Sequence, residues 1–131
     1  VASFLVKHLR IHWMEGEKHF KNCLVDYNEA SNVAQWQWVA GCGADAAPYF
    51  RIFNPILQGE KFDKKGLYVK RWVPEINKVP EKFTHKPWEM ELKYQQAIKT
   101  IIGKDYPKPM VIHEKARSSA LEAFQTLKKK N

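Results

Sequence analysis

Apolar residues recur along this chain with the three- to four-residue spacing of helices, and no segment alternates apolar and polar positions as a strand does. The spacing predicts helices at about 1–12, 16–25, 29–40, 54–62, 65–73, 87–102 and 113–129. Prolines fall between these segments or in their first turns, because a proline further inside a helix removes a hydrogen bond and clashes with the preceding turn. The pattern therefore predicts an all-α protein, a helical bundle.

The connections and the two ends add detail to this pattern. The proline-bounded stretch 79–86 is expected to be a surface connector. Val1 opens on an apolar helical pattern without a capping residue, which predicts that the chain begins within a helix. The segment 113–129 ends in lysines, which suit the negative end of a helix dipole, and is typical of a natural C-terminus. We expect one domain, or part of one.

Composition and charge narrow the class of protein. Of the 131 residues 44% are hydrophobic, enough for the core of one domain. Lys7, His8 and Arg10 come too early for a signal peptide and no long apolar run follows, so we expect a soluble, cytoplasmic protein. Cys23 and Cys42 lack metal-site spacing and are expected to be unpaired thiols. The net charge of +8 favours a polyanionic partner, although simple solubility explains it equally.

Familiar catalytic arrangements are missing from the sequence. There is no Ser-His-Asp set, no pair of carboxylates at a useful spacing and no cysteine cluster. His8 and His12 are four apart on a predicted helix, but a pair of histidines without a third ligand is weak evidence for a metal. We therefore expect no metal site.

The most informative segment is 26–38, in which a polar turn leads into a helix with two tryptophans. Asn28 or Glu29 can begin that helix by accepting from its free N–H groups. Trp36 and Trp38 are two apart and lie on different faces, so one can be core and the other exposed. Packing alone explains such a pair, whereas a partly buried tryptophan also suits stacking against a flat ligand or base.

Longer motifs carry a family resemblance. The runs ASFLVKHLRIHW, EGEKHF, SNxxxWQW, DAAPYFRIFNP and QGEKFD occur in the order that they have in the DNA photolyase/cryptochrome family. The resemblance continues through KRWVPEI, VPEKFTHKPWEM and YPKPMVIHEKAR and covers practically the whole chain. Residues 1–131 thus resemble the C-terminal half of the FAD-binding helical domain, most closely that of bacterial class I cyclobutane pyrimidine dimer photolyases. The upstream helices and the antenna domain with its chromophore would lie outside the chain.

The resemblance implies a set of FAD-binding residues. Asp26 would lie near the isoalloxazine and pair with an arginine outside this chain. Tyr27 and Asn28 stand where the family has Gly and Asp, which implies contacts from their backbone to the flavin edge. Asn32 matches the residue that faces flavin N5, where its amide is expected to donate to the reduced flavin. An asparagine there is typical of photolyases rather than cryptochromes.

Four further residues have roles implied by the resemblance. Trp36 and Trp13 match the inner and middle members of the tryptophan chain that passes electrons to the photoexcited flavin, with hydrophobic packing as the alternative. Trp38 matches the aromatic residue that lines the cavity for the flipped-out dimer. Arg51 matches a basic residue on the DNA-facing side, with support of its own loop as the alternative.

The resemblance implies an enzyme, a deoxyribodipyrimidine photo-lyase, in the full-length protein. Light-excited reduced FAD would donate one electron to a pyrimidine dimer in DNA, whose ring opens before the electron returns. We expect a monomer, and expect the chain alone to bind FAD weakly or not at all and to be inactive. Two alternatives remain, a cryptochrome photoreceptor and, for the isolated chain, a basic helical module without catalytic activity.

Overall fold

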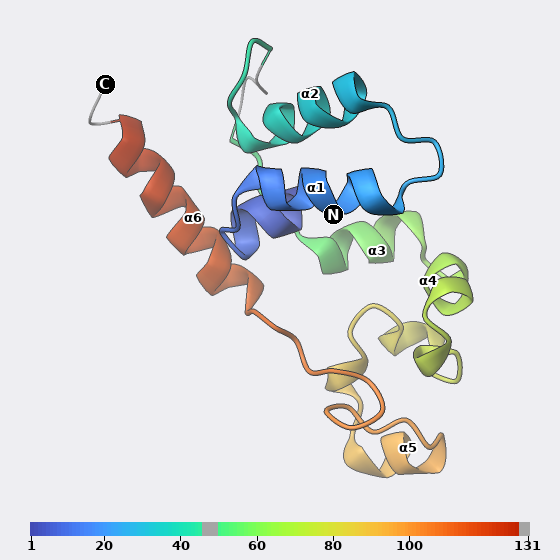
Figure 1. Ribbon diagram of the computed structural model, residues 1–131. Helices are drawn as coiled ribbons and strands as arrows, with labels where there is room; N and C mark the ends of the chain where they lie inside the picture. Colours follow the sequence, from blue (N-terminus) through green and yellow to red (C-terminus); the bar gives the residue numbers. More distant parts are fainter. Residues whose placement is uncertain (46–49, 129–131) are drawn as a thin grey trace. The chain divides into compact units, whose positions relative to one another are not determined.

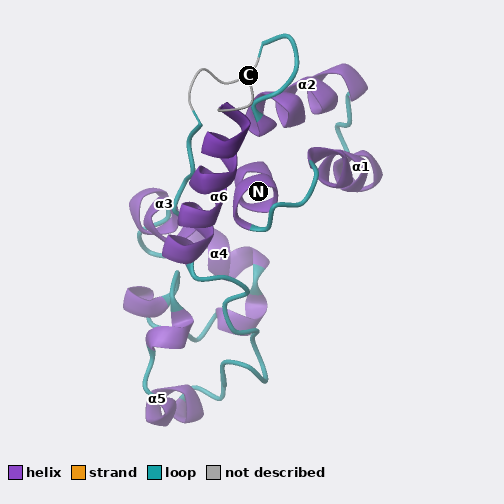
Figure 2. Ribbon diagram, turned by 90° about the vertical axis from the view of Figure 1, so that its left-hand side faces the viewer, coloured by secondary structure: helices purple, strands orange, loops and turns teal. Residues whose placement is uncertain are grey.

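The computed structural model describes residues 1–45 and 50–128, which form helices joined by loops, without a strand among those residues (Figure 2). The all-α prediction is therefore confirmed. Within the same residues no helix has both the length and the apolar character needed to cross a membrane. The chain divides into two compact units: unit 1 is Val1–Phe53 with Val111–Asn131, and unit 2 is Asn54–Met110.

The described residues of unit 1 form four helical elements, taken from both ends of the chain. They are the π-helix η1 (Phe4–His8) and the α-helices α1 (Trp13–Cys23), α2 (Glu29–Ala40) and α6 (His113–Lys128). Helix α1 lies against α2, and η1 contacts α1, α2 and α6 (Figure 1). Unit 1 is thus a small helical cluster whose last helix comes from the far end of the sequence.

Side-chain caps determine where α1 and α2 begin. The ring of His12 accepts from the N–H of Met14 at 3.4 Å, so α1 begins at Trp13, three residues before the predicted start. Asn28 Oδ1 accepts from the N–H of Ser31 at 2.9 Å and starts α2 where it was predicted. Gly41 ends α2 in the left-handed region, at φ 78°, as a helix C-terminus favours.

The predicted helix 1–12 is wrong beyond residue 8. The π-helix η1 ends at His8, and Arg10 has a φ of 55°, which no helix accommodates. The guanidinium of Arg10 donates to Ser119 Oγ of α6 at 3.2 Å. The end of η1 thus coincides with a contact to α6, which is distant in the sequence. Periodicity along the sequence does not reveal such a contact.

A pair of histidines joins η1 to α6. His8 is only 5% exposed, and its Nε2 lies 2.8 Å from Nδ1 of His113, a distance that requires a shared hydrogen. The Phe4 ring stacks on His8 at 5.1 Å between centroids. Burial lowers the pKa of His8, the nearby His113 lowers it further, and the Ser3 carbonyl acts in the opposite direction. The contact therefore favours the neutral imidazole of His8.

Unit 2 consists of short helices around a small apolar core. The elements are α3 (Pro55–Phe62), α4 (Leu67–Trp72), η2 (Pro74–Ile76), η3 (Glu81–Phe83), η4 (Pro87–Glu89) and α5 (Leu92–Ala97), where η2 to η4 are 3₁₀ turns. Ile76, Val79 and Met90 form the core, and half-buried apolar side chains surround them. The helices are short because prolines begin or precede several of them.

The prediction of a surface connector at 79–86 is wrong. Val79 is 0% and Thr84 1% exposed, so this stretch supplies part of the core of unit 2. Thr84 lies so close to Gly66 that a Cβ on that glycine would come within 2.3 Å of it, and Gly66 has a φ of 68°. Prolines interrupt helices, but here the turn between them faces inward.

The single helix predicted at 87–102 is also wrong. The 3₁₀ turn η4 and the six-residue α5 replace it, and Lys99 has a φ of 55°. The buried Gln95 donates to the Met90 carbonyl at 2.7 Å and accepts from the Ile102 N–H at 2.9 Å. One side chain thus holds both flanking loops to the short helix.

Helix α4 begins at Leu67 rather than near residue 65. The Asp63 carboxylate accepts from the N–H groups of Tyr68 at 3.1 Å and Val69 at 3.0 Å and so caps this helix from outside it. Partial loss of water raises the pKa of Asp63, but the N–H donors and the nearby His85 outweigh it, and the net pKa is lowered. The ionised carboxylate is the form that caps α4.

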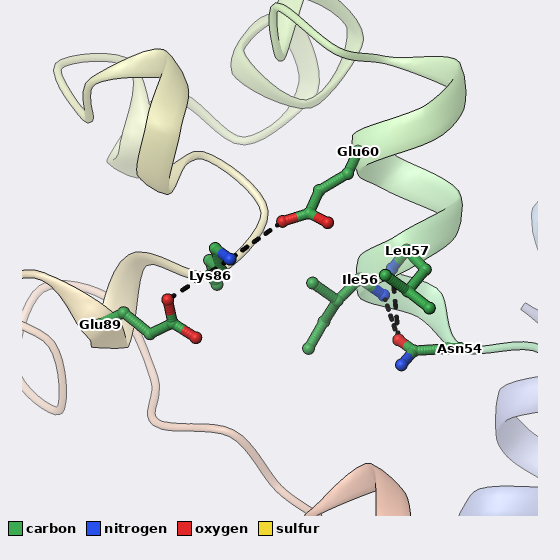
Figure 3. A network of polar contacts seen from close by, with 6 residues as sticks. All are labelled: Asn54, Ile56, Leu57, Glu60, Lys86 and Glu89. Atoms are coloured by element: carbon green, nitrogen blue, oxygen red, sulfur yellow. Dashed lines mark hydrogen bonds and ion pairs between the residues drawn. The ribbon is translucent and has the colours of Figure 1, made fainter.

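Helix α3 begins at a capping asparagine that Figure 3 shows in detail. Asn54 Oδ1 accepts from the N–H groups of Ile56 at 3.0 Å and Leu57 at 3.3 Å (Figure 3). Proline follows as the first helical residue, a position where its missing N–H costs nothing. This start agrees with the predicted helix 54–62.

An ion-pair network in the same view joins α3 to η4. Lys86 Nζ lies 3.1 Å from Glu60 and 3.5 Å from Glu89 (Figure 3). The hydrogen bond and charge of Glu60, followed by the charge of Glu89, raise the pKa of Lys86. Because the three groups are partly exposed, the network orients the loop before η4 more than it stabilises the fold.

The histidine pair predicts a pH dependence of stability. The pKa of His8 in the folded chain is below its ordinary 6.5, so the unfolded chain binds the proton first as the pH falls. The contribution to the free energy of unfolding is therefore complete above about pH 6.5 and declines below it. Thermal unfolding between pH 8 and pH 5 should show this decline, and His8→Gln should flatten it. An unchanged slope in His8→Gln would contradict the role of the pair.

Candidate functional site

A pocket of about 280 Å³ in unit 1 gathers most of the expected cofactor residues. Asp26, Asn28 and Asn32 line it, together with Trp36. The remaining lining is mainly apolar and includes Phe20, Leu24 and Val39. The turn before α2 and the first turns of that helix therefore form one wall, with α1 beside them. A mostly apolar pocket with a few polar groups is typical of a site for a flat organic ligand.

Two hydrogen bonds fix the orientation of the Asn32 side chain. It is 8% exposed, and its Nδ2 donates to the Glu17 backbone oxygen at 3.1 Å and to Glu17 Oε1 at 3.0 Å. Both partners are acceptors, so the amide nitrogen must face Glu17. The oxygen Oδ1 is then the atom that remains for a ligand. The amide is expected from sequence to donate to the flavin, but in this arrangement its donors bind Glu17.

Trp36 is fixed by a close approach of α1 to α2. It is 2% exposed, and the Phe20 ring meets it edge-on at 5.1 Å and 80°. A Cβ added to Gly16 would lie 2.1 Å from the Trp36 ring, so only glycine fits there. The indole therefore lies in a recess of α1 and forms the back of the pocket.

The tryptophan pair behaves as its spacing predicts. Trp36 is buried whereas Trp38 is 41% exposed, so the two residues do face different ways. Trp38 lines a separate hollow of about 190 Å³ beside the turn after α2, together with Gln35, Gln37 and residues 42–45. An exposed indole over a shallow hollow is suited to stacking a base.

The other expected site residues lie outside the first pocket. The Tyr27 side chain does not line it; Lys21 Nζ lies 5.9 Å from the centre of its ring, and its buried hydroxyl has no partner among the described residues. Trp13 is half-buried at the start of α1, with the His12 ring 5.7 Å away. Arg51 is exposed in the loop that follows the undescribed residues 46–49.

Sequence reasoning missed two residues, Gly16 and Glu17, that do not line this pocket but contact the lining residues Trp36 and Asn32. Gly16 carried a usable signal, because a glycine inside a helix often marks a close approach. Glu17 carried none, since a glutamate on a helix is ordinarily a solvated residue.

Cys23 and Cys42 are exposed free thiols, and no group of three metal-ligating side chains occurs among residues 1–45 and 50–128.

Helices that enclose an apolar pocket with a buried amide and a buried indole define a ligand-binding helical domain. The family described as "FAD binding domain of DNA photolyase" matches residues 1–126, and the chain belongs to this family. Curated relatives named deoxyribodipyrimidine photo-lyase include that of Agrobacterium fabrum, 57% identical over 98% of this chain, and that of Escherichia coli, 48% identical over 98%. The chain spans about a quarter of their length, 27% and 26%.

Solved structures agree with this family. A bacterial class III photolyase from Agrobacterium tumefaciens has a TM-score of 0.90 at 57% identity and covers 98% of this chain and 27% of its own. A Synechocystis cryptochrome has a TM-score of 0.84 at 36% identity, covering 92% and 25%. The expected relation to class I therefore stays a prediction, whereas the family and its helical FAD-binding domain are confirmed.

The pocket fits part of the family's cofactor. Its volume of about 280 Å³ lies just below the usual range of ligand pockets, roughly 300–1,000 Å³, and suits a ring system rather than a whole dinucleotide. Asn32 Oδ1 offers an acceptor and Asn28 begins a helix whose free N–H groups favour electron-rich atoms. The residues present therefore fit an isoalloxazine edge.

The contact between Gly16 and Trp36 leads to a mutational prediction. Gly16→Ala places a methyl group into the indole, so we expect a loss of about 1–3 kcal/mol in the free energy of unfolding, as in overpacked cores. Denaturant unfolding measures the loss, and a shift of tryptophan emission reports the displaced ring. Lys18→Ala, on the exposed side of the same helix, is the matched control. Equal stability of the two variants would contradict a close contact between Gly16 and the Trp36 ring.

Proposed function

We propose that this chain is the C-terminal part of the FAD-binding domain of a larger photolyase that repairs cyclobutane pyrimidine dimers in DNA with light. One observation carries the proposal. Asn32 and Trp36, which are four residues apart on α2, are both buried and both line the same apolar pocket. The relatives named deoxyribodipyrimidine photo-lyase support it, since they match nearly all of this chain.

Bound FAD supplies a light-excited one-electron donor, and the residues of the chain hold it. Asp26 and the backbone around Asn28 hold the edge of the ring at the start of α2. Asn32, kept in one orientation by Glu17, presents Oδ1 as an acceptor for a ring N–H. The apolar side chains of the pocket exclude water from this edge. Tyr27 contributes its backbone.

Trp36 and Trp13 form the electron path of the proposal. Trp36 lines the pocket and is buried from water. Trp13 is half-buried and is the first residue of α1. In this path Trp13 passes an electron to Trp36, and Trp36 passes it to the pocket. A purely structural role of both indoles is the alternative, and flavin photoreduction in phenylalanine variants separates the two.

Trp38 and Arg51 act on the DNA in this proposal. Trp38 is exposed over its hollow and stacks on a flipped-out pyrimidine. Arg51 is exposed and binds a phosphate. The net charge of +8 supports a polyanionic partner. The full-length protein acts as a monomer in the cytoplasm.

A cryptochrome photoreceptor is the second candidate. The Synechocystis cryptochrome, with its TM-score of 0.84, favours it. The Agrobacterium photolyase has the higher identity, 57% against 36%, and Asn32 is the residue that the family resemblance associates with repair. Repair is therefore the preferred function.

The deciding experiment is illumination of the full-length flavoprotein with DNA that contains one thymine dimer, followed by assay of the restored thymines. We expect repair, and expect Trp38→Ala to weaken binding of that DNA by about 1–3 kcal/mol, the contribution of one stacked base. Trp72→Ala, which removes an exposed indole of unit 2, is the control. Flavin photoreduction without repair would favour the photoreceptor, and absence of a flavin would contradict both.

Glu17→Ala tests the orientation of Asn32. Loss of the side-chain acceptor lets the amide turn, so we expect FAD to dissociate more easily by about 1 kcal/mol, roughly fivefold in Kd. Equilibrium dialysis followed by the visible spectrum measures this affinity without any assay of repair. Glu15→Ala, an exposed glutamate of the same helix, serves as the control. Unchanged FAD affinity in Glu17→Ala would exclude the orienting role.

A further inference from the structure

Lys7 is a charged residue in an unusual environment. It belongs to η1 and is only 5% exposed. Its ammonium group donates to the backbone oxygen of Arg51 at 2.5 Å, a short and charge-assisted hydrogen bond. No ion pair joins Lys7 to a carboxylate in the described part of the chain. A buried cation is thus held by a loop carbonyl rather than by an acid.

The same ammonium group contacts the residue before Arg51. Lys7 Nζ lies 5.0 Å from the centroid of the Phe50 ring, within the range of a cation–π interaction. The Phe50 ring in turn stacks on Phe124 of α6, with centroids 4.4 Å apart and planes 5° from parallel. One lysine therefore fixes two consecutive loop residues, one by its ring and the other by its carbonyl.

The contacts of Lys7 compensate a real cost. Burial lowers the pKa of Lys7, because the ammonium group loses water that would stabilise its charge. A cation that only had to pack in this helix would be replaced by an apolar residue without that cost. The charge of Lys7 strengthens the hydrogen bond to the loop carbonyl of Arg51. The role of the charge is therefore to hold this loop.

Residues 50–54 have no regular secondary structure, so side-chain contacts determine their position. Arg51 is exposed within this loop. We infer that Lys7 is a positioning residue for DNA binding, which fixes the backbone of Arg51 and thereby directs its guanidinium towards a phosphate of the bound DNA. The inference rests on the proposed function, in which Arg51 contacts DNA, and extends it to a buried residue without access to the ligand.

A merely structural role of Lys7 makes a different prediction. Loss of a packing contact lowers stability but leaves the affinity of the folded protein for DNA unchanged. A positioning role weakens DNA binding through Arg51 alone, so its effect must disappear once Arg51 is removed. The two roles are therefore separated by a double-mutant cycle.

The test uses the full-length flavoprotein and a duplex with one thymine dimer, with affinity measured at several salt concentrations. Lys7→Met should weaken binding about tenfold and lower the salt slope by about one, as the loss of one phosphate contact does. Arg51→Ala should have a similar effect, and the double variant should be little weaker than Arg51→Ala. Lys7→Arg should restore most of the affinity. Lys18→Met, the same charge change at an exposed site of α1, is the control.

Two outcomes overturn the inference while the proposed function stands. One is unchanged affinity in Lys7→Met, and the other is a full, additive loss in the double variant. If wild-type protein binds no dimer-containing DNA, the proposed function fails and the inference fails with it. The visible flavin spectrum of each variant shows whether its folded site is retained.

Phe50→Leu provides an independent variant if Lys7→Met does not fold. It leaves the lysine in place but removes the ring beside the ammonium group. We expect weaker DNA binding and faster hydrogen exchange at the amides of Ile52 and Phe53, because the loop loses one of its two anchors. Normal exchange at these amides together with normal affinity would overturn the positioning role.

Discussion

The close approach of α1 to α2 at Gly16 is the constraint on which the site of unit 1 depends. Because no side chain projects from Gly16, the Trp36 indole fits directly against the backbone of α1. Phe20, one turn further along α1, then meets the same ring edge-on. This contact sets the distance between the helices, and with it the reach from Glu17 on α1 to Asn32 on α2. The packing and the polar geometry of the pocket therefore have one origin.

The orientation of Asn32 in this pocket is determined by Glu17, a residue that does not line the pocket. Glu17 uses both its backbone and side-chain oxygens on one nitrogen of Asn32, which leaves the amide a single way to face the pocket. A preorganised acceptor costs no reorganisation when a ligand binds. A similar arrangement occurs at the loop that carries Arg51, where Lys7 holds the backbone of a residue whose side chain is exposed. In both places a neighbouring side chain holds the residue that a ligand would meet.

The sequence predicts helices well where their signals are local. Helix α2 begins after Asn28 as predicted, α3 begins within one residue of its predicted start, and the Trp36–Trp38 spacing predicts that one indole can be buried while the other is exposed. It fails where a distant backbone group takes part, as at Gln95, whose side chain binds loops on both sides of α5. The family motifs bring Asp26, Asn28, Asn32 and Trp36 to one pocket. Glu17 and Lys7 were not predicted, because residues that act through hydrogen bonds to other residues leave no pattern in their own spacing.

The order of the units along the chain has a consequence for how the protein is made. Unit 2 is one continuous stretch, Asn54–Met110, whereas unit 1 is built from the segments on either side of it. The contacts of η1 with α6, such as His8 with His113, are separated by 105 residues. During synthesis the first segment must wait until unit 2 has left the ribosome before α6 reaches it, and contacts of such separation form slowly. The surface of η1 that contacts α6 therefore stays uncovered by that helix until His113–Lys128 has been synthesised.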